Sequence, residues 1–105
     1  MIKKGLFVLC LILFVHAAQA ADVPVDLEHL AFNPDRLTIQ TGDTVIFSNK
    51  DEVIHNVQVA QESGSVEDEG LQKPGEQVKV NFAEPGVYQV HCAAHPKMKM
   101  VITVN

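Results

Sequence analysis

Cysteine, basic residues and long apolar runs are all scarce in this chain of 105 residues. It has two cysteines, and its 8 Lys and Arg residues face 13 Asp and Glu residues, which leaves a net charge of −5. The length allows one domain and leaves no room for a second. The acidic balance argues against nucleic acid or an anionic membrane surface as a partner, and it mildly favours a basic protein partner.

The longest apolar run, residues 5–15, is shorter than the about 20 residues that a membrane-spanning helix needs. A membrane anchor is therefore the weaker interpretation of this run. Two lysines precede it, and Ala18 and Ala20 follow it in an A-x-A pattern. A basic start, a short apolar stretch and small residues are typical of a secretory signal peptide. We expect residues 1–20 to be this signal, cleaved after Ala20, and residues 21–105 to be an exported, periplasmic domain without membrane insertion.

Cleavage at this point would change both the cysteine count and the charge. It removes Cys10 and two lysines, so the mature chain carries one cysteine and, with 6 basic and 13 acidic residues, a net charge of −7. Such a chain cannot form an internal disulfide, although disulfides persist in the compartment that it enters. A lone exported thiol indicates an intermolecular bridge, an inert buried residue or a metal ligand. The residues around Cys92 distinguish these possibilities.

Short segments in which apolar and polar residues alternate follow one another from residue 36 onward, with turn residues between them. This pattern predicts an all-β sandwich or barrel, because alternation with period two places one face of each strand in a core. Residues 61–70 are polar and acidic, and we expect them to form an exposed loop. The segments expected to be strands are 36–40, 44–49, 55–60, 78–82, 87–92 and 101–104.

Soft metal donors are concentrated near the end of the chain, within residues 91–100. Cys92 is expected to end a strand with its sulfur in the core, and His95 and Met98 follow at intervals of three residues. His55 begins another strand with the same parity, and the packing of the sheets can bring it beside them. Imidazole and thiolate bind soft or borderline metals, and a thioether selects copper over zinc. Hard cations such as Ca²⁺ are excluded, because they require oxygen ligands.

Each of these residues alone has an ordinary structural explanation, such as a cysteine that acts as a small buried hydrophobe. Together, Cys-x-x-His-x-x-Met and an upstream His-Asn at the start of a strand indicate a copper site. A Cys/His nucleophile pair is the rival interpretation. It lacks an orienting acid in the loop, and it leaves His55 and the methionines without a role. Catalytic metal sites keep an open position for substrate, and this donor set leaves none, so we do not expect an enzyme.

These motifs resemble those of the small cupredoxins, the blue-copper proteins of the plastocyanin, amicyanin and pseudoazurin group. The spacing Cys-x-x-His-Pro-x-Met is most similar to that of amicyanin. The resemblance implies a Greek-key β-sandwich of about seven to eight strands that binds one type 1 copper through His55, Cys92, His95 and Met98. It also implies that Asn56 joins the two ligand loops by hydrogen bonds. The matching segments are 32–34, 37–39, 42–45, 47–49, 55–57, 73–76, 84–88, the Cys92 loop and 101–105.

The chain departs from the resembled group at three places. Ile54 stands where many members have proline, and Ala93 and Ala94 stand where Thr-Pro or Ser-Pro is frequent. Met100 replaces what is often glycine and is an alternative axial ligand. Alternation does not separate the two methionines, because they share a parity. We prefer Met98, since this choice leaves a last strand of full length.

The main hypothesis is an exported, monomeric electron-transfer protein that shuttles single electrons between redox partners. A c-type cytochrome, a dehydrogenase or a reductase is a suitable partner, and nucleic acid is not. His95 is expected near the surface beside Ala94 and Pro96, in a small apolar patch through which an electron leaves. The alternative is a copper delivery or resistance protein that transfers the ion itself.

Overall fold

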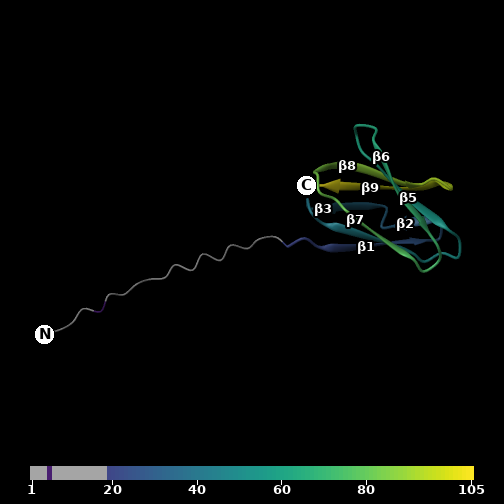
Figure 1. The fold of residues 1–105 in the computed structure, drawn as a ribbon, viewed down its shortest axis with the longest axis horizontal. Helices are drawn as coiled ribbons and strands as arrows, with labels where there is room; N and C mark the ends of the chain where they lie inside the picture. The colour runs from purple at the N-terminus through teal and green to yellow at the C-terminus, as the bar shows by residue number, and fades with distance from the viewer. Residues whose placement is uncertain (1–4, 6–18) are drawn as a thin grey trace.

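The computed structural model describes residues 5 and 19–105 and arranges them in two β-sheets (Figure 1). The strand order is β2-β1-β4-β7 in the four-stranded sheet and β3-β9-β8-β5-β6 in the five-stranded sheet. The strands are β1 (Asp22–Glu28), β2 (Ala31–Asn33), β3 (Arg36–Ile39), β4 (Thr44–Asn49), β5 (His55–Ala60), β6 (Val66–Gln72), β7 (Gln77–Asn81), β8 (Gly86–Cys92) and β9 (His95–Val104).

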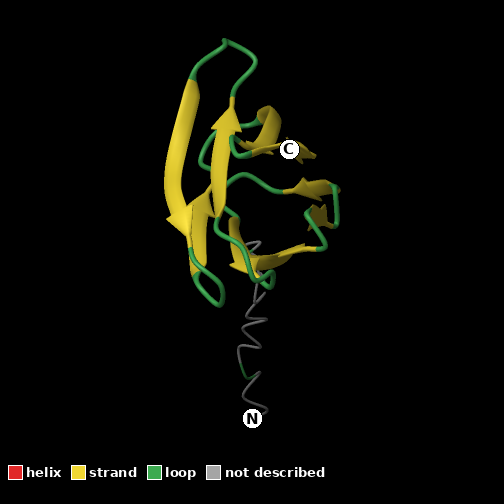
Figure 2. Ribbon diagram, turned by 90° about the vertical axis from the view of Figure 1, so that its right-hand side faces the viewer, coloured by secondary structure: helices red, strands yellow, loops and turns green. Residues whose placement is uncertain are grey.

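The two sheets enclose one apolar core, and the described residues are strands connected by loops (Figure 2). Burial follows the alternation in the sequence, as on β9, where Met98, Met100, Ile102 and Val104 are buried between more exposed neighbours. Two strand pairs, β1 with β4 and β3 with β9, are parallel. A tight hairpin cannot join parallel strands, and in both pairs other strands lie between the two members along the chain. The all-β sandwich predicted from the sequence is confirmed.

The structure of two segments differs from the sequence-based prediction. Residues 61–70 were expected to be a loop, but from Val66 onward they belong to β6. This strand lies at the edge of its sheet and is exposed over most of its length, so no apolar alternation reveals it. Its acidic side chains suit an edge, because charge there prevents pairing with another chain. The last strand begins at His95, not at residue 101. With β2 and β6, the described residues form nine strands instead of about seven to eight.

Several strands that carry predicted site residues begin or end at one end of the sandwich. β5 begins at His55, β8 ends at Cys92 and β9 begins at His95. Cys92 pairs directly with His95, and the register of this ladder shifts between His91 and Cys92. Such irregularities re-aim side chains and are frequent beside functional sites. In Figure 1 the start of β9, in yellow, lies at the same end as the end of β1.

The predicted signal peptide, residues 1–20, lies almost wholly outside the described residues. Within the residues that the structure describes, no helix has the length and apolar character needed to cross a membrane.

Candidate metal centre

Three of the predicted ligands meet at this end of the sandwich, although they belong to different strands. The Nδ1 atom of His55 lies 3.3 Å from the Nδ1 atom of His95. The Sγ atom of Cys92 lies 3.9 Å from Nδ1 of His55 and 3.5 Å from Nδ1 of His95. Of the residues described, these three form the one group of His, Cys, Asp or Glu side chains placed to hold a metal ion.

His55 is fully buried, and Asp51 determines how its ring is turned. The Nε2 atom of His55 lies 2.7 Å from Oδ2 of Asp51. A carboxylate only accepts hydrogen bonds, so Nε2 is the donor in this pair, and the ring turns its other nitrogen, Nδ1, towards the centre. Burial raises the pKa of Asp51, but hydrogen bonds from the imidazole and from two backbone N–H groups outweigh it, so the pKa lies below its usual value.

Cys92 is a free, fully buried cysteine whose sulfur is held by Asn56. The backbone N–H of Asn56 donates to Sγ at 3.3 Å, while its side-chain Oδ1 accepts from the N–H of Ala93 at 3.4 Å. On its other side, Nδ2 of Asn56 donates to Oδ1 of Asp68 at 2.8 Å and to the carbonyl of Gly70 at 3.0 Å. Asn56 therefore connects the Cys92 loop, the start of β5 and the edge strand β6.

His95 is half-buried, because it begins β9 at the rim of the sandwich. A mainly apolar surface hollow lies beside it, lined by Leu30, Ala94, Pro96, Lys97 and Met98 together with His95 itself. Leu30 is 53% exposed, so the β1–β2 turn presents an apolar side chain next to the imidazole. The structure thus places an apolar patch around His95, as the sequence predicts, and extends it with Leu30.

Met98 and Met100 are both buried, at 1% and 2% exposure, so burial does not choose between them. Their places in the β8–β9 ladder differ. Met100 pairs with Val90 in the regular part of the ladder. Met98 lies in the irregular part, between the Cys92–His95 pair and Lys99, and it lines the hollow beside His95. This placement favours Met98 as the axial ligand.

The separations of the three ligand atoms fit one metal ion. Bonds from a metal to nitrogen and sulfur are about 2.0–2.3 Å in proteins, so ligands arranged around one ion lie roughly 3.4–3.8 Å apart. The observed separations of 3.3, 3.5 and 3.9 Å lie within this range or about 0.1 Å outside it. Two imidazoles and a thiolate, with a buried thioether on the adjoining strand, match the donor set of a blue-copper site.

Two residues that support the centre, Asp51 and Asp68, were missed by sequence analysis. The acidic residues near Asp68 resemble an ordinary solvated run, and Asp51 lies in a connecting loop without a recognisable motif. Among the described residues, two other histidines lie apart from the centre. The side chain of His29 is 89% exposed in the β1–β2 turn, and His91 pairs with Gln58 and Lys99 within its sheet.

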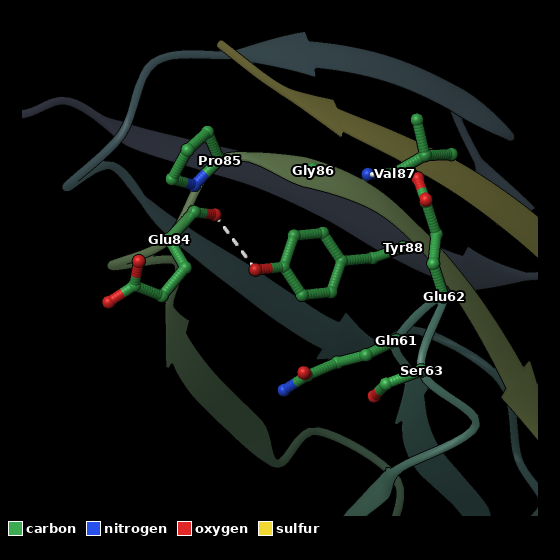
Figure 3. A pocket seen from close by; sticks show the side chains of 8 residues that line it. All are labelled: Gln61, Glu62, Ser63, Glu84, Pro85, Gly86, Val87 and Tyr88. Atoms are coloured by element: carbon green, nitrogen blue, oxygen red, sulfur yellow. Dashed lines mark hydrogen bonds between the residues drawn. The ribbon is translucent and has the colours of Figure 1, made fainter.

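A second surface hollow lies at the opposite end of β8, where the strand begins at Gly86 (Figure 3). Its lining includes Glu62, Glu84 and Tyr88. The Tyr88 hydroxyl donates to the carbonyl of Glu84 at 2.8 Å, and Glu62 accepts from the N–H of Val87 at 3.2 Å. These two hydrogen bonds hold the turn before β8 and the loop after β5 together. The polar groups of Glu62 and Tyr88 therefore have a structural role in this hollow.

Comparison with known proteins agrees with this geometry. The family of copper binding proteins described as the plastocyanin/azurin family matches residues 19–105. Amicyanin of Paracoccus denitrificans is 33% identical over 93 residues, which cover 85% of this chain and 71% of the relative. A putative pseudoazurin of Rhizobium leguminosarum bv. viciae is 35% identical over 115 aligned positions, covering 99% and 74% of the two chains. A solved structure of an amicyanin variant with Cu(I) superimposes with a TM-score of 0.74 at 25% identity, covering 86% of this chain and 87% of the other.

Proposed function

The chain belongs to the plastocyanin/azurin family of copper-binding proteins, and we propose that it holds one type 1 copper ion through His55, Cys92, His95 and Met98. Its function is one-electron transfer, as in the related amicyanin and pseudoazurin. The observation that carries the proposal is the convergence of the Cys92 sulfur and two imidazole Nδ1 atoms within 4.8 Å of one another. A bound copper ion supplies a couple between Cu(II) and Cu(I).

The residues around the centre restrict its rearrangement, which is what an electron carrier requires. His55 and Cys92 are fully buried at the ends of paired strands. Asn56 joins their two segments by hydrogen bonds to Cys92 and Ala93. A donor set held in this way would move little between the two oxidation states of a bound copper ion, so each electron would be accompanied by little reorganisation, and the Met98 thioether would tune the potential.

The electron leaves through His95 in this proposal, because His95 is the predicted ligand at the rim of the sandwich. The apolar patch of Leu30, Ala94 and Pro96 beside it suits brief docking of a redox protein, since small interfaces are typical of transient electron-transfer encounters. A c-type cytochrome, a dehydrogenase or a reductase is the class of partner that we propose. In this proposal the protein is a monomeric carrier. It is not an enzyme, because its own side chains provide the full donor set and leave no position on the metal for a substrate.

Copper delivery is the alternative function, and the comparisons give it no support. The related proteins are electron carriers, and the buried His55 and Cys92 suit retention of an ion more than its release.

Export to the periplasm, with cleavage after Ala20, is part of the same proposal. It is supported by the position of Ala21, the first residue of the predicted mature chain. The N–H of Ala21 donates to Oδ1 of Asp43 at 2.8 Å, and its carbonyl accepts from the N–H of Thr44 at 2.9 Å. The fold therefore engages the chain directly after the proposed cleavage site. Mass spectrometry of the exported protein tests this point, and a mass that includes residues 1–20 would contradict it.

The visible spectrum of the copper-loaded protein is the experiment that tests the function. We expect a blue protein with an intense band towards the red end, and loss of this band in Cys92→Ser, whose far-ultraviolet circular dichroism should match that of the parent. Reduction and reoxidation by a c-type cytochrome, followed by stopped flow, should leave the copper bound through many cycles. A colourless protein that takes up only zinc would refute the proposal.

A further inference from the structure

Asp51 lies in the connection between β4 and β5, and its carboxylate accepts three hydrogen bonds. Oδ1 accepts from the N–H of His29 at 2.8 Å. Oδ2 accepts from the N–H of Leu30 at 3.0 Å and from Nε2 of His55 at 2.7 Å. The Asp51 side chain is 14% exposed and the His55 side chain 0%. One carboxylate therefore bridges a buried imidazole and the β1–β2 turn.

The turn at the far side of this bridge has an unusual backbone. His29 and Leu30 both have positive φ angles, 56° and 55°, a conformation that residues with a β-carbon rarely adopt. Both N–H groups of this turn are directed at Asp51, which gives the turn a fixed partner. Because Leu30 also lines the hollow beside His95, Asp51 connects one proposed ligand to the surface patch around another.

The bridge also brings a negative charge to the proposed ligand set. Across the described part of the chain, Asp51 provides the one carboxylate oxygen within 4.0 Å of a nitrogen of His55 or His95. A carboxylate that accepts from a ligating imidazole fixes its tautomer and raises its basicity as a ligand. A nearby negative charge favours the more highly charged Cu(II) over Cu(I). The charge of Asp51 is screened little by water, because its carboxylate contacts the fully buried His55 ring and is itself mostly buried.

We propose that Asp51 is a positioning residue of the copper centre, which keeps Nδ1 of His55 directed at the ligand set and lowers the reduction potential. The inference rests on the proposed function, since it takes His55 as a ligand. It deepens that function by assigning the orientation of His55, and part of the potential, to a residue outside the ligand set.

The first test uses the copper-free protein and needs no variant. Nitrogen-15 NMR of the His55 ring at neutral pH should show the proton on Nε2, with a slowly exchanging N–H signal shifted downfield by the carboxylate. A ring with its proton on Nδ1, or one that exchanges both tautomers freely, would overturn the proposal. This readout does not depend on copper.

The second test compares Asp51→Asn with Glu52→Gln. Each variant removes one negative charge from the same loop, but Glu52 is exposed and has no described contact with His55. Mutation of a residue that hydrogen-bonds to a metal ligand typically lowers the metal affinity by about 10-fold or more. We expect Asp51→Asn to weaken Cu(II) relative to Cu(I) by about tenfold, which raises the potential by about 59 mV for a one-electron couple. The exposed control should shift the potential by less than a third of this amount.

Equal shifts in the two variants would overturn the assignment, because general charge would then account for the whole effect. Failure of the function and failure of this inference remain distinguishable. A parent protein that does not become blue with copper refutes the proposed function, whereas a blue parent with matching shifts in both variants refutes only the role of Asp51.

Discussion

Replacing Asn56 by alanine tests whether its side chain holds the Cys92 loop in place. The substitution removes three hydrogen bonds, to Asp68, Gly70 and Ala93. It leaves the bond from its own backbone N–H to the Cys92 sulfur unchanged, because this donor belongs to the main chain. The measured effect therefore reports the side chain that connects the loop to β6.

The expected loss of stability follows from these contacts. A neutral hydrogen bond contributes about 1 kcal/mol and one to a charged group about 1.5–3 kcal/mol. The three partners are exposed and regain hydrogen bonds with water, so the total lies below the simple sum of these values, at about 2 kcal/mol. For a domain of this size, each kcal/mol corresponds to about 4–8 °C in Tm. Asn56→Ala should accordingly lower Tm by about 8–16 °C.

Thermal unfolding of the copper-free protein, followed by circular dichroism, measures this change. Gln58→Ala is the matched control, because Gln58 lies on the same strand and donates one bond to the same Asp68 carboxylate at 2.9 Å. This exposed bond should contribute about 0.5 kcal/mol, or less than about 4 °C. Equal shifts in the two variants would refute the reasoning, since Asn56 would then contribute no more than a surface residue.

Three further predictions concern the axial ligand, the surface charge and the response to pH. Met98→Leu should change the colour and the potential of the copper protein, while Met100→Leu should cost less than about 1.5 kcal/mol of unfolding free energy and leave the colour unchanged; the reverse spectra would make Met100 the ligand. The mature chain has a net charge of −7, so its electron exchange with a basic cytochrome should slow as the salt concentration rises, because salt screens charge steering within about 8–10 Å. A rate that does not depend on salt would assign docking to the apolar patch alone. The backbone N–H groups of Ala21 and Gln40 hold the pKa of Asp43 below its usual value. Its ionised form therefore stabilises the fold at neutral pH, and this contribution should disappear as pH falls from about 4 through the lowered folded-state pKa. Urea unfolding at stepped pH should show a smaller decline in Asp43→Asn, and an unchanged decline would contradict the prediction.

The alternation of apolar and polar residues was sufficient to predict an all-β sandwich or barrel, and the resemblance to the small cupredoxins selected the sandwich. Strand residues that alternate with period two can bury only one face, so the pattern shows which side chains enter the core. This reasoning placed Cys92 and His55 inward, and both are fully buried. The donor types alone indicated the metal, because thiolate, imidazole and thioether together select copper.

The acidic edge strand β6 could not be predicted in the same way. An edge strand exposed over most of its length needs no apolar face, so its sequence resembles that of a solvated loop. The alternation also could not distinguish Met98 from Met100, because both lie on the same face of their strand. The irregular register beside Cys92 distinguishes their positions, and such an irregularity depends on how two strands pair.

Only the tertiary structure decided that Asp51 and Asp68 support the centre. Asp51 meets His29 across 22 positions of sequence, and Asp68 meets Asn56 across 12. These hydrogen bonds depend on which strand ends the packed sheets bring together, and no local pattern encodes that arrangement. The sequence by itself determined the kinds of ligands and the faces of the strands on which they lie, because those follow from residue chemistry and a period of two. Their partners depend on the packing of one sheet against the other, because a hydrogen bond requires two groups within about 3 Å in space, whatever their distance along the chain.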